Sequence, residues 1–107
     1  MTIQDQIAEF LAAQRAERGL AAATVAAYRR DLLDYASFLG PRAPTASLAA
    51  AYVAALHRRG LAPASIARHI AALRGFHRFL VAEGLAADDP TVLLDTPRRR
   101  DALPKAL

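Results

Sequence analysis

The sequence contains no cysteine and no tryptophan, and its basic residues include a single lysine. Without cysteine the chain can form no disulfide, no thiol nucleophile and no cysteine-based metal site, which fits a cytoplasmic location. No apolar run approaches the ~18 residues that a transmembrane helix needs. The first residues, MTIQDQIAEF, lack the basic region followed by an apolar one that marks a signal peptide. We therefore expect no membrane insertion.

Alanine and arginine are abundant instead. Alanine makes up about a quarter of the chain, far above its usual share, and it favours helices that approach one another closely. Thirteen of the fourteen basic residues are arginine, and the net charge is +4. This balance is compatible with a nucleic-acid partner, which rewards clustered cations. Arginines on solvated faces, encoded by a GC-rich genome, would give the same composition.

Hydrophobic periodicity predicts four main helices joined by short connections. Thr2 and Asp5 form a capping box at the start of the first helix, and Gly19 ends that helix. The other helices are expected over about 22–39, 45–59 and 63–83, each followed by a glycine. Strand signals are absent. The predicted fold class is therefore all-α, with four helices in two helical hairpins around a thin core.

The end of the chain is expected to differ from the rest. Asp89 and Thr91 are candidate N-caps for a short fifth helix over Val92–Leu94. After Thr96, the residues PRRRDALPKAL contain two prolines and four cations with little periodicity, which is typical of an extended basic linker. We therefore divide the chain into a helical domain, residues 1–96, and a linker, residues 97–107.

Two stretches of the sequence repeat each other. RGLAAATVA precedes the second helix and RGLAPASIA precedes the fourth, and each places a hydroxyl residue, Thr24 or Ser65, in the first helical turn. The repetition predicts two helix pairs built alike, in which Leu20 and Leu61 pack beneath the following helix as hydrophobic staples. Chance in an alanine-rich chain is the alternative explanation.

The sides of the second and fourth helices that face away from the expected core are candidate DNA-binding surfaces. On the fourth helix, arginines alternate there with very small residues. Small residues let a helix lie close to a phosphate backbone or groove floor, and arginines reach phosphates or guanine edges. This side of the fourth helix carries Ala64, Arg68, Ala71, Gly75 and Arg78, and that of the second carries Ala26, Arg30, Leu33 and Ser37, with Arg29 on its flank. A solvated surface explains the same pattern, and Arg30 can pair with Asp34 four residues later.

No set of side chains indicates catalysis or metal binding. His57, His69 and His77 lack the spacing of helical metal ligands, and we expect His77 in the core with one hydrogen bond. Asp88 and Asp89 are adjacent at an expected helix start, which favours capping over acid–base chemistry. The tyrosines lie on apolar stripes, and no glycine-rich phosphate loop is present. We therefore expect no catalytic residue, no metal site and no cofactor in this chain.

Several segments, taken in order, resemble the tyrosine recombinases, especially the XerC/XerD branch. GLAAATVAAYRRDLLDYASFL is similar to the family segment GLSxxTxxAYxxDLxxFxxFL, and SIARHIAALRGFHRFLVAEG followed by DDP resembles the family's fourth helix and the turn after it. TPRRRDALPKAL is similar to the interdomain linker. The resemblance spans residues 3–107, and the YRRDL and DDP runs are most like XerD.

This resemblance implies an N-terminal, SAM-like core-binding domain. In the family, this domain and a catalytic domain clamp a recombination half-site for strand exchange, which includes chromosome dimer resolution. The reaction passes through a 3′-phosphotyrosyl DNA intermediate and needs no cofactor, and its catalytic residues lie in the catalytic domain, so this chain is not expected to cut DNA. The implied partners are double-stranded DNA and recombinase subunits of the same or a sister protein in a tetrameric synapse. The implied location is cytoplasmic and nucleoid-associated.

The resemblance implies DNA contacts at the positions of this sequence that match the family's DNA-contacting segments. They are Thr24, Arg29 and Arg30 in the second helix, Arg68, Ala71, Ala72, Gly75 and Arg78 on the expected exposed side of the fourth, and Arg98, Arg99 and Arg100 in the linker. Arg74 borders the core face and has a structural interpretation. The family's serine after Gly-Leu is replaced by Ala21 and Ala62, which removes an N-cap worth about 1 kcal/mol from each helix.

Other functions remain open at this point. A helical protein-interaction module explains the alanine content but not the placement of the arginines. An integrase of a phage or mobile element fits the same family. A small stand-alone helix-turn-helix regulator would need a tight helix pair and a dimer interface, and neither is evident.

Overall fold

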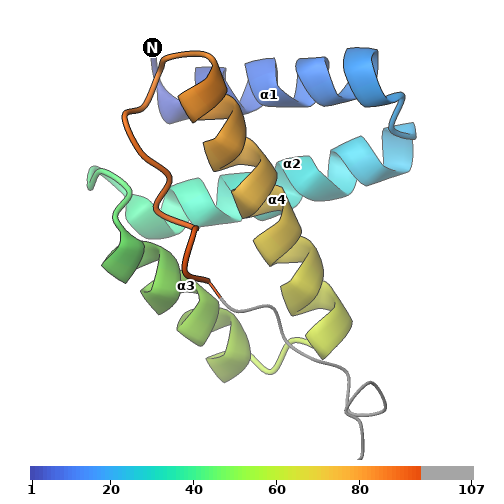
Figure 1. Cartoon of the computed structure of the whole chain (residues 1–107). Coiled ribbons are helices and arrows are strands. Elements are labelled where there is room, and N and C mark those ends of the chain that lie inside the picture. Colours follow the sequence, from blue (N-terminus) through green and yellow to red (C-terminus); the bar gives the residue numbers. More distant parts are fainter. Residues whose placement is uncertain (95–107) are drawn as a thin grey trace, which may run out of the picture.

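The computed structural model of the chain describes residues 1–94. These residues form four helices and no strand. The helices are α1 (Ile3–Arg18), α2 (Ala22–Leu39), α3 (Ala46–Arg58) and α4 (Pro63–Ala82). α1 and α2 lie side by side, and α4 crosses both of them (Figure 1). α2 and α4 each contact every other helix, whereas α1 and α3 do not touch. The predicted all-α class with four main helices is confirmed.

The helix ends follow from local sequence. The Thr2 hydroxyl accepts a hydrogen bond from the Asp5 amide at 3.0 Å, and the Asp5 carboxylate accepts one from the Thr2 amide at 3.1 Å. This confirms the predicted capping box. Gly19 ends α1 in the left-handed region, at φ 62°, which glycine adopts without a steric penalty. Thr45 caps α3 by accepting from the amide of Leu48 at 3.1 Å.

α2 and α4 begin without a side-chain cap. Their N-cap residues are Ala21 and Ala62, as expected, and neither can accept a hydrogen bond through its side chain. Leu20 and Leu61 are partly buried against the core before these two helices, which confirms the packing that the repeated sequence predicts. The two helices that resemble each other at their starts are also the two central helices of the fold.

The core joins the four helices through large side chains. Tyr35, Tyr52, Phe10 and Phe76 are among the largest fully buried residues. A Cβ atom on Gly75 would lie only 3.0 Å from the Phe10 ring, so the glycine allows α1 and α4 to approach closely.

His77 belongs to the core, with 2% of its surface exposed. Its Nε2 atom lies 2.9 Å from the Tyr35 hydroxyl. This confirms the predicted core histidine with one hydrogen bond.

The segment after α4 corrects one prediction. Residues 90–93 form a turn, so the short fifth helix expected over Val92–Leu94 is not present. Asp89 instead accepts hydrogen bonds from the Thr91 amide at 2.8 Å and the Thr91 hydroxyl at 2.6 Å. Three residues offer too few backbone hydrogen bonds to offset the cost of starting a helix. The predicted linker, residues 97–107, lies outside the described residues.

Within residues 1–94, no helix combines the length and the hydropathy that crossing a bilayer requires.

Candidate nucleic-acid interface

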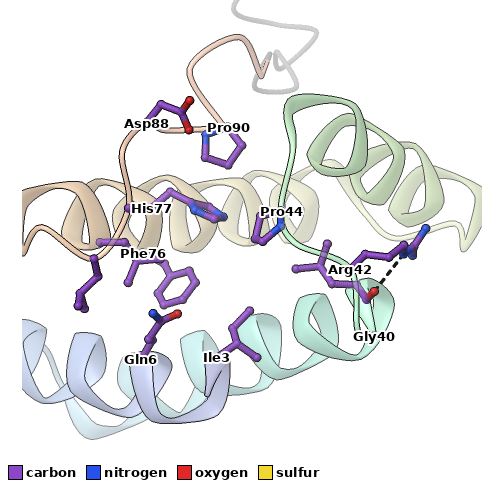
Figure 2. A pocket seen from close by; sticks show the side chains of 13 residues that line it. Ile3, Gln6, Gly40, Arg42, Pro44, Phe76, His77, Asp88 and Pro90 are labelled. Atoms are coloured by element: carbon purple, nitrogen blue, oxygen red, sulfur yellow. Dashed lines mark hydrogen bonds between the residues drawn. The ribbon is translucent and has the colours of Figure 1, made fainter. Parts of the chain in front are cut away.

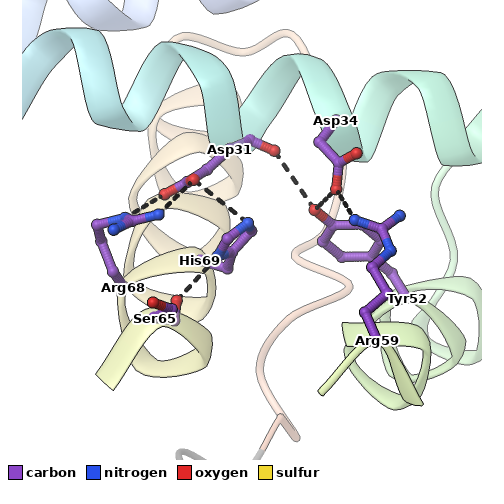
Figure 3. A network of polar contacts seen from close by, with 7 residues as sticks. All are labelled: Asp31, Asp34, Tyr52, Arg59, Ser65, Arg68 and His69. Atoms are coloured by element: carbon purple, nitrogen blue, oxygen red, sulfur yellow. Dashed lines mark hydrogen bonds and ion pairs between the residues drawn. The ribbon is translucent and has the colours of Figure 1, made fainter. Parts of the chain in front are cut away.

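An ion pair between α2 and α4 positions Arg68. Asp31 on α2 is 3% exposed, and its two carboxylate oxygens accept from Arg68 Nε at 2.8 Å and from Arg68 Nη2 at 2.9 Å (Figure 3). This two-point contact fixes the plane of the guanidinium. The Arg68 side chain remains 41% exposed. One edge of the guanidinium is therefore held by the protein, and no other residue among 1–94 accepts from it.

His69 completes this anchor from the next position of α4. Its Nδ1 atom lies 2.8 Å from the Ser65 carbonyl oxygen, and its Nε2 atom lies 3.2 Å from Asp31 Oδ1. Each ring nitrogen of His69 therefore has an oxygen acceptor within hydrogen-bond or ion-pair distance. The buried carboxylate of Asp31 thus has polar partners on two sides, Arg68 and His69 (Figure 3).

Asp34 forms a second polar cluster. Its carboxylate accepts from the Tyr52 hydroxyl at 2.6 Å and from Arg59 Nη1 at 2.8 Å, both on the α3 side of the fold. Burial raises the pKa of the Asp34 carboxyl, but these two hydrogen bonds outweigh burial and the pKa lies below its usual value. The pair between Arg30 and Asp34 that the helical spacing allows is therefore not formed. Arg30 is exposed and has no partner among the described residues.

The eight candidate DNA contacts within the described residues fall into three groups. Arg29, Arg30, Ala71 and Arg78 are exposed, whereas Thr24, Arg68 and Gly75 are half-buried. Ala72 is fully buried at 0% exposure, so its expected place on the outer side of α4 is wrong. α4 packs against three helices, and its buried face is consequently wider than a single stripe. Arg98, Arg99 and Arg100 lie outside the described residues.

A cavity of about 340 Å³ lies among the N-terminal end of α1, the segment after α2 and the turn after α4 (Figure 2). We call it the His77 hollow. Its lining includes Ile3, Gln6, Pro44, Phe76 and His77. Burial lowers the pKa of His77 to about 4, although Asp89 opposes the shift, so the ring is neutral near pH 7. Among residues 1–94, no three histidine or acidic side chains cluster closely enough to hold a metal ion.

The outer side of α4 opens into a second cavity, of about 310 Å³, between α1, α2 and α4. We call it the basic hollow. It is lined by Arg18 and Gln14 of α1, by Tyr28 of α2, and by Arg74, Gly75 and Arg78 of α4, together with Phe10 and Ala71. Arg74 also donates to the backbone carbonyl of Leu94, so it ties the last turn to α4.

Sequence reasoning identified only part of this cavity. It singled out Ala71, Gly75 and Arg78 and gave Arg74 a structural interpretation. It assigned no contact to Arg18 or Gln14 and treated Tyr28 as a core residue. Tyr28 is half-buried and packs against the core while also lining the basic hollow. The sequence places Arg18 at the end of the first helix but contains no local signal for its position at this cavity.

The family described as phage integrase, N-terminal SAM-like domain, matches residues 7–84. The chain belongs to this family. The match runs from within α1 to the glycine that follows α4 and therefore includes both sides of the basic hollow. The predicted resemblance to the N-terminal domain of tyrosine recombinases is confirmed.

Curated relatives of this SAM-like domain are tyrosine recombinases. The domain is 42% identical to "Tyrosine recombinase XerD" of Agrobacterium fabrum, over 95% of this chain and 32% of the relative. It is 51% identical to "Tyrosine recombinase XerC" of Erythrobacter litoralis, over 94% of this chain and 33% of the relative. The chain thus spans about a third of the length of these two relatives. One of them is named XerD and the other XerC. No solved structure gives a significant match.

Proposed function

We propose that this SAM-like domain binds double-stranded DNA at a recombination half-site, as the core-binding part of a site-specific tyrosine recombinase. The observation that carries the proposal is the outer side of α4, where Arg68 and Arg78 flank the small residue Ala71 and the basic hollow opens beside them. Arginines placed around a small-residue surface suit close contact with a charged backbone and with base edges.

The parent protein is then a recombinase of the XerC/XerD type acting in chromosome dimer resolution. In this proposal, residues outside the chain form the 3′-phosphotyrosyl DNA link, and four recombinase subunits of the same or a sister protein assemble at the synapse in the nucleoid. Residues 97–107 serve as the linker toward the catalytic domain, and Arg98, Arg99 and Arg100 contact DNA between the domains. The names of the relatives support the recombinase assignment.

Two alternatives have specific support. The description of the matching family, phage integrase, favours an integrase of a phage or mobile element. The His77 hollow, lined in part by apolar side chains, favours a protein contact on a different part of the domain (Figure 2). A protein-interaction function predicts binding that changes little with salt, whereas DNA binding predicts a steep loss.

Fluorescence anisotropy of this chain with a labelled Xer-type half-site duplex, at several salt concentrations, tests the proposal. We expect log K to fall linearly with log salt, by about 0.9 for each phosphate neutralised, and binding to exceed that of a scrambled duplex. Arg78→Gln should weaken binding, because Arg78 lies on the proposed face. Arg58→Gln is the matched control, since Arg58 is an exposed arginine at the end of α3. Absence of binding at low salt would contradict DNA binding by this domain and would favour a protein partner.

A further inference from the structure

We infer that the basic hollow is a binding site for one phosphate group of the DNA backbone, built by α1 together with α2 and α4. This assignment rests on the proposed DNA-binding function and extends the DNA contacts to Arg18, at the end of α1. The first helix would then be part of the interface rather than only its support.

The charges around the hollow favour an anion. Arg18, Arg74 and Arg78 all line it, and none of its lining residues is acidic. Arg18 and Arg78 line the cavity from different helices, and an anion bound there would be attracted by both guanidinium groups. Guanidinium groups also match the oxygens of a phosphate with paired hydrogen bonds. Asp89 lines an adjacent cavity together with Arg74 and Arg78 and offsets part of their charge, but it does not line the basic hollow, and of these two cavities Arg18 lines only the hollow.

The architecture keeps the hollow open to a ligand. Gln14 and Arg18 are four residues apart on α1, and Arg74 and Arg78 are four residues apart on α4, so each helix presents two polar side chains on successive turns. Between them α4 has Gly75, which contributes no side chain. The ring of Phe10, against which Gly75 packs, also lines the cavity. The two helices thus surround the hollow with donors and leave space between them.

The hollow also adjoins the anchored Arg68. Ala71, which lines the hollow, lies three residues after Arg68 on α4, so Arg68 is about one helical turn away from the cavity. A phosphate in the hollow would place the adjoining part of the duplex next to Arg68. The backbone contact would fix the register in which Arg68 meets the DNA.

The variant Arg18→Gln tests the assignment, with Arg15→Gln as a matched control. Both arginines are exposed in the last turns of α1, but only Arg18 lines the hollow. Neither has a partner among residues 1–94, so both variants should fold, which thermal melting followed by circular dichroism checks. Loss of one phosphate contact should reduce the salt slope by about 0.9 and the affinity by about eightfold at ~0.1 M salt. Arg15→Gln should leave both quantities near those of the unchanged chain.

A set of duplexes carries the test to a single phosphate. Each duplex has one backbone phosphate replaced by a neutral methylphosphonate. At one position, the methylphosphonate should lower the affinity of the unchanged chain. The same substitution should not lower the affinity of Arg18→Gln, because that variant already lacks the contact with this phosphate. Equal effects of Arg18→Gln and Arg15→Gln, with salt-dependent binding otherwise intact, would overturn the phosphate site and leave the proposed function standing.

Two further outcomes have distinct meanings. If the unchanged chain does not bind duplex at any salt concentration, the proposed function and the phosphate site fail together. Inorganic phosphate, titrated while side-chain NMR signals of the arginines are observed, distinguishes the source of the anion. Saturation by millimolar phosphate without competition from duplex would overturn the assignment to DNA in favour of a small anion.

Discussion

The guanidinium of Arg68 on α4 holds the buried carboxylate of Asp31 on α2 through two hydrogen bonds, at 2.8 and 2.9 Å. The two residues are 37 positions apart in the sequence, so the contact forms only when the helices pack. Arg68 therefore has a structural role in addition to the DNA contact proposed for it. The exposed remainder of its side chain is held in a fixed orientation, which reduces the side-chain entropy that DNA binding would otherwise remove.

Replacing Arg68 with Ala should lower the free energy of unfolding by about 3 kcal/mol, near the low end for breaking a buried pair because Arg68 is partly exposed. The variant would leave Asp31 with His69 as its remaining side-chain partner. Arg78→Ala should change stability by less than about 0.5 kcal/mol, since Arg78 is exposed. Urea denaturation measures both values. If Arg68→Ala is as stable as the unchanged chain, the pair contributes little and the side chain is free for DNA.

Arg68→Ala should also weaken DNA binding, by roughly 1–3 kcal/mol if Arg68 reads a base edge. The measurement is anisotropy below the unfolding transition, with the folded fraction determined for each protein. Asp31→Asn serves as the comparison, because it retains the Arg68 side chain while removing the charge that fixes it. Unchanged affinity in Arg68→Ala, once corrected for folding, would remove Arg68 from the DNA-contact set.

The burial of His77 should make the domain less stable as the pH is lowered. Its pKa is about 4 in the folded chain against 6.5 in the reference state, because burial disfavours the charged ring. Between these values the unfolded chain binds more protons than the folded one, so stability falls as the pH decreases from 6.5 toward 4. The full loss is about 3 kcal/mol.

Urea titrations at several pH values measure this effect. His77→Gln should flatten the dependence, because an amide does not titrate in this range and can still bond to the Tyr35 hydroxyl. His57→Gln is the control, since His57 is exposed at the end of α3. An equally steep dependence in His77→Gln would assign the titration to other groups.

The helices could be predicted from the sequence because their signals are local. α2 runs from Ala22 to Leu39 as expected, and the capping box at Thr2 needs only residues three apart. The possible pair between Arg30 and Asp34 also followed from local spacing, but Asp34 has other partners. Tyr52 and Arg59 reach Asp34 from 18 and 25 residues away, and no rule for a single helix contains them.

The candidate site was predictable only in part for the same reason. The outer position of Ala71 and Arg78 follows from helical periodicity, whereas the burial of Ala72 depends on how many helices pack against α4. The basic hollow takes its residues from three helices. Arg18 could not be assigned to it before the angle between α1 and α4 was known.

Leu73→Ala should destabilise the domain by roughly 2–5 kcal/mol, because Leu73 is fully buried and its truncation leaves a cavity. Tyr28→Ala should be less destabilising, since Tyr28 is half-buried at the basic hollow rather than enclosed. Chemical denaturation of the two variants checks the order. A Leu73→Ala protein as stable as the unchanged chain would contradict the facing of α4.

The uncapped starts of α2 and α4 offer a route to a more stable domain. Ala21→Ser and Ala62→Ser should each raise the free energy of unfolding by about 1 kcal/mol, because a serine hydroxyl can accept from a free amide in the first turn. The backbone at both positions is already extended, as an N-cap requires. Ala26→Ser is the control, since Ala26 is exposed inside α2, where serine is a poorer helix former than alanine. The two caps lie on different helices, so their effects should add in the double variant. If the control stabilises as much as Ala21→Ser, the gain does not come from capping.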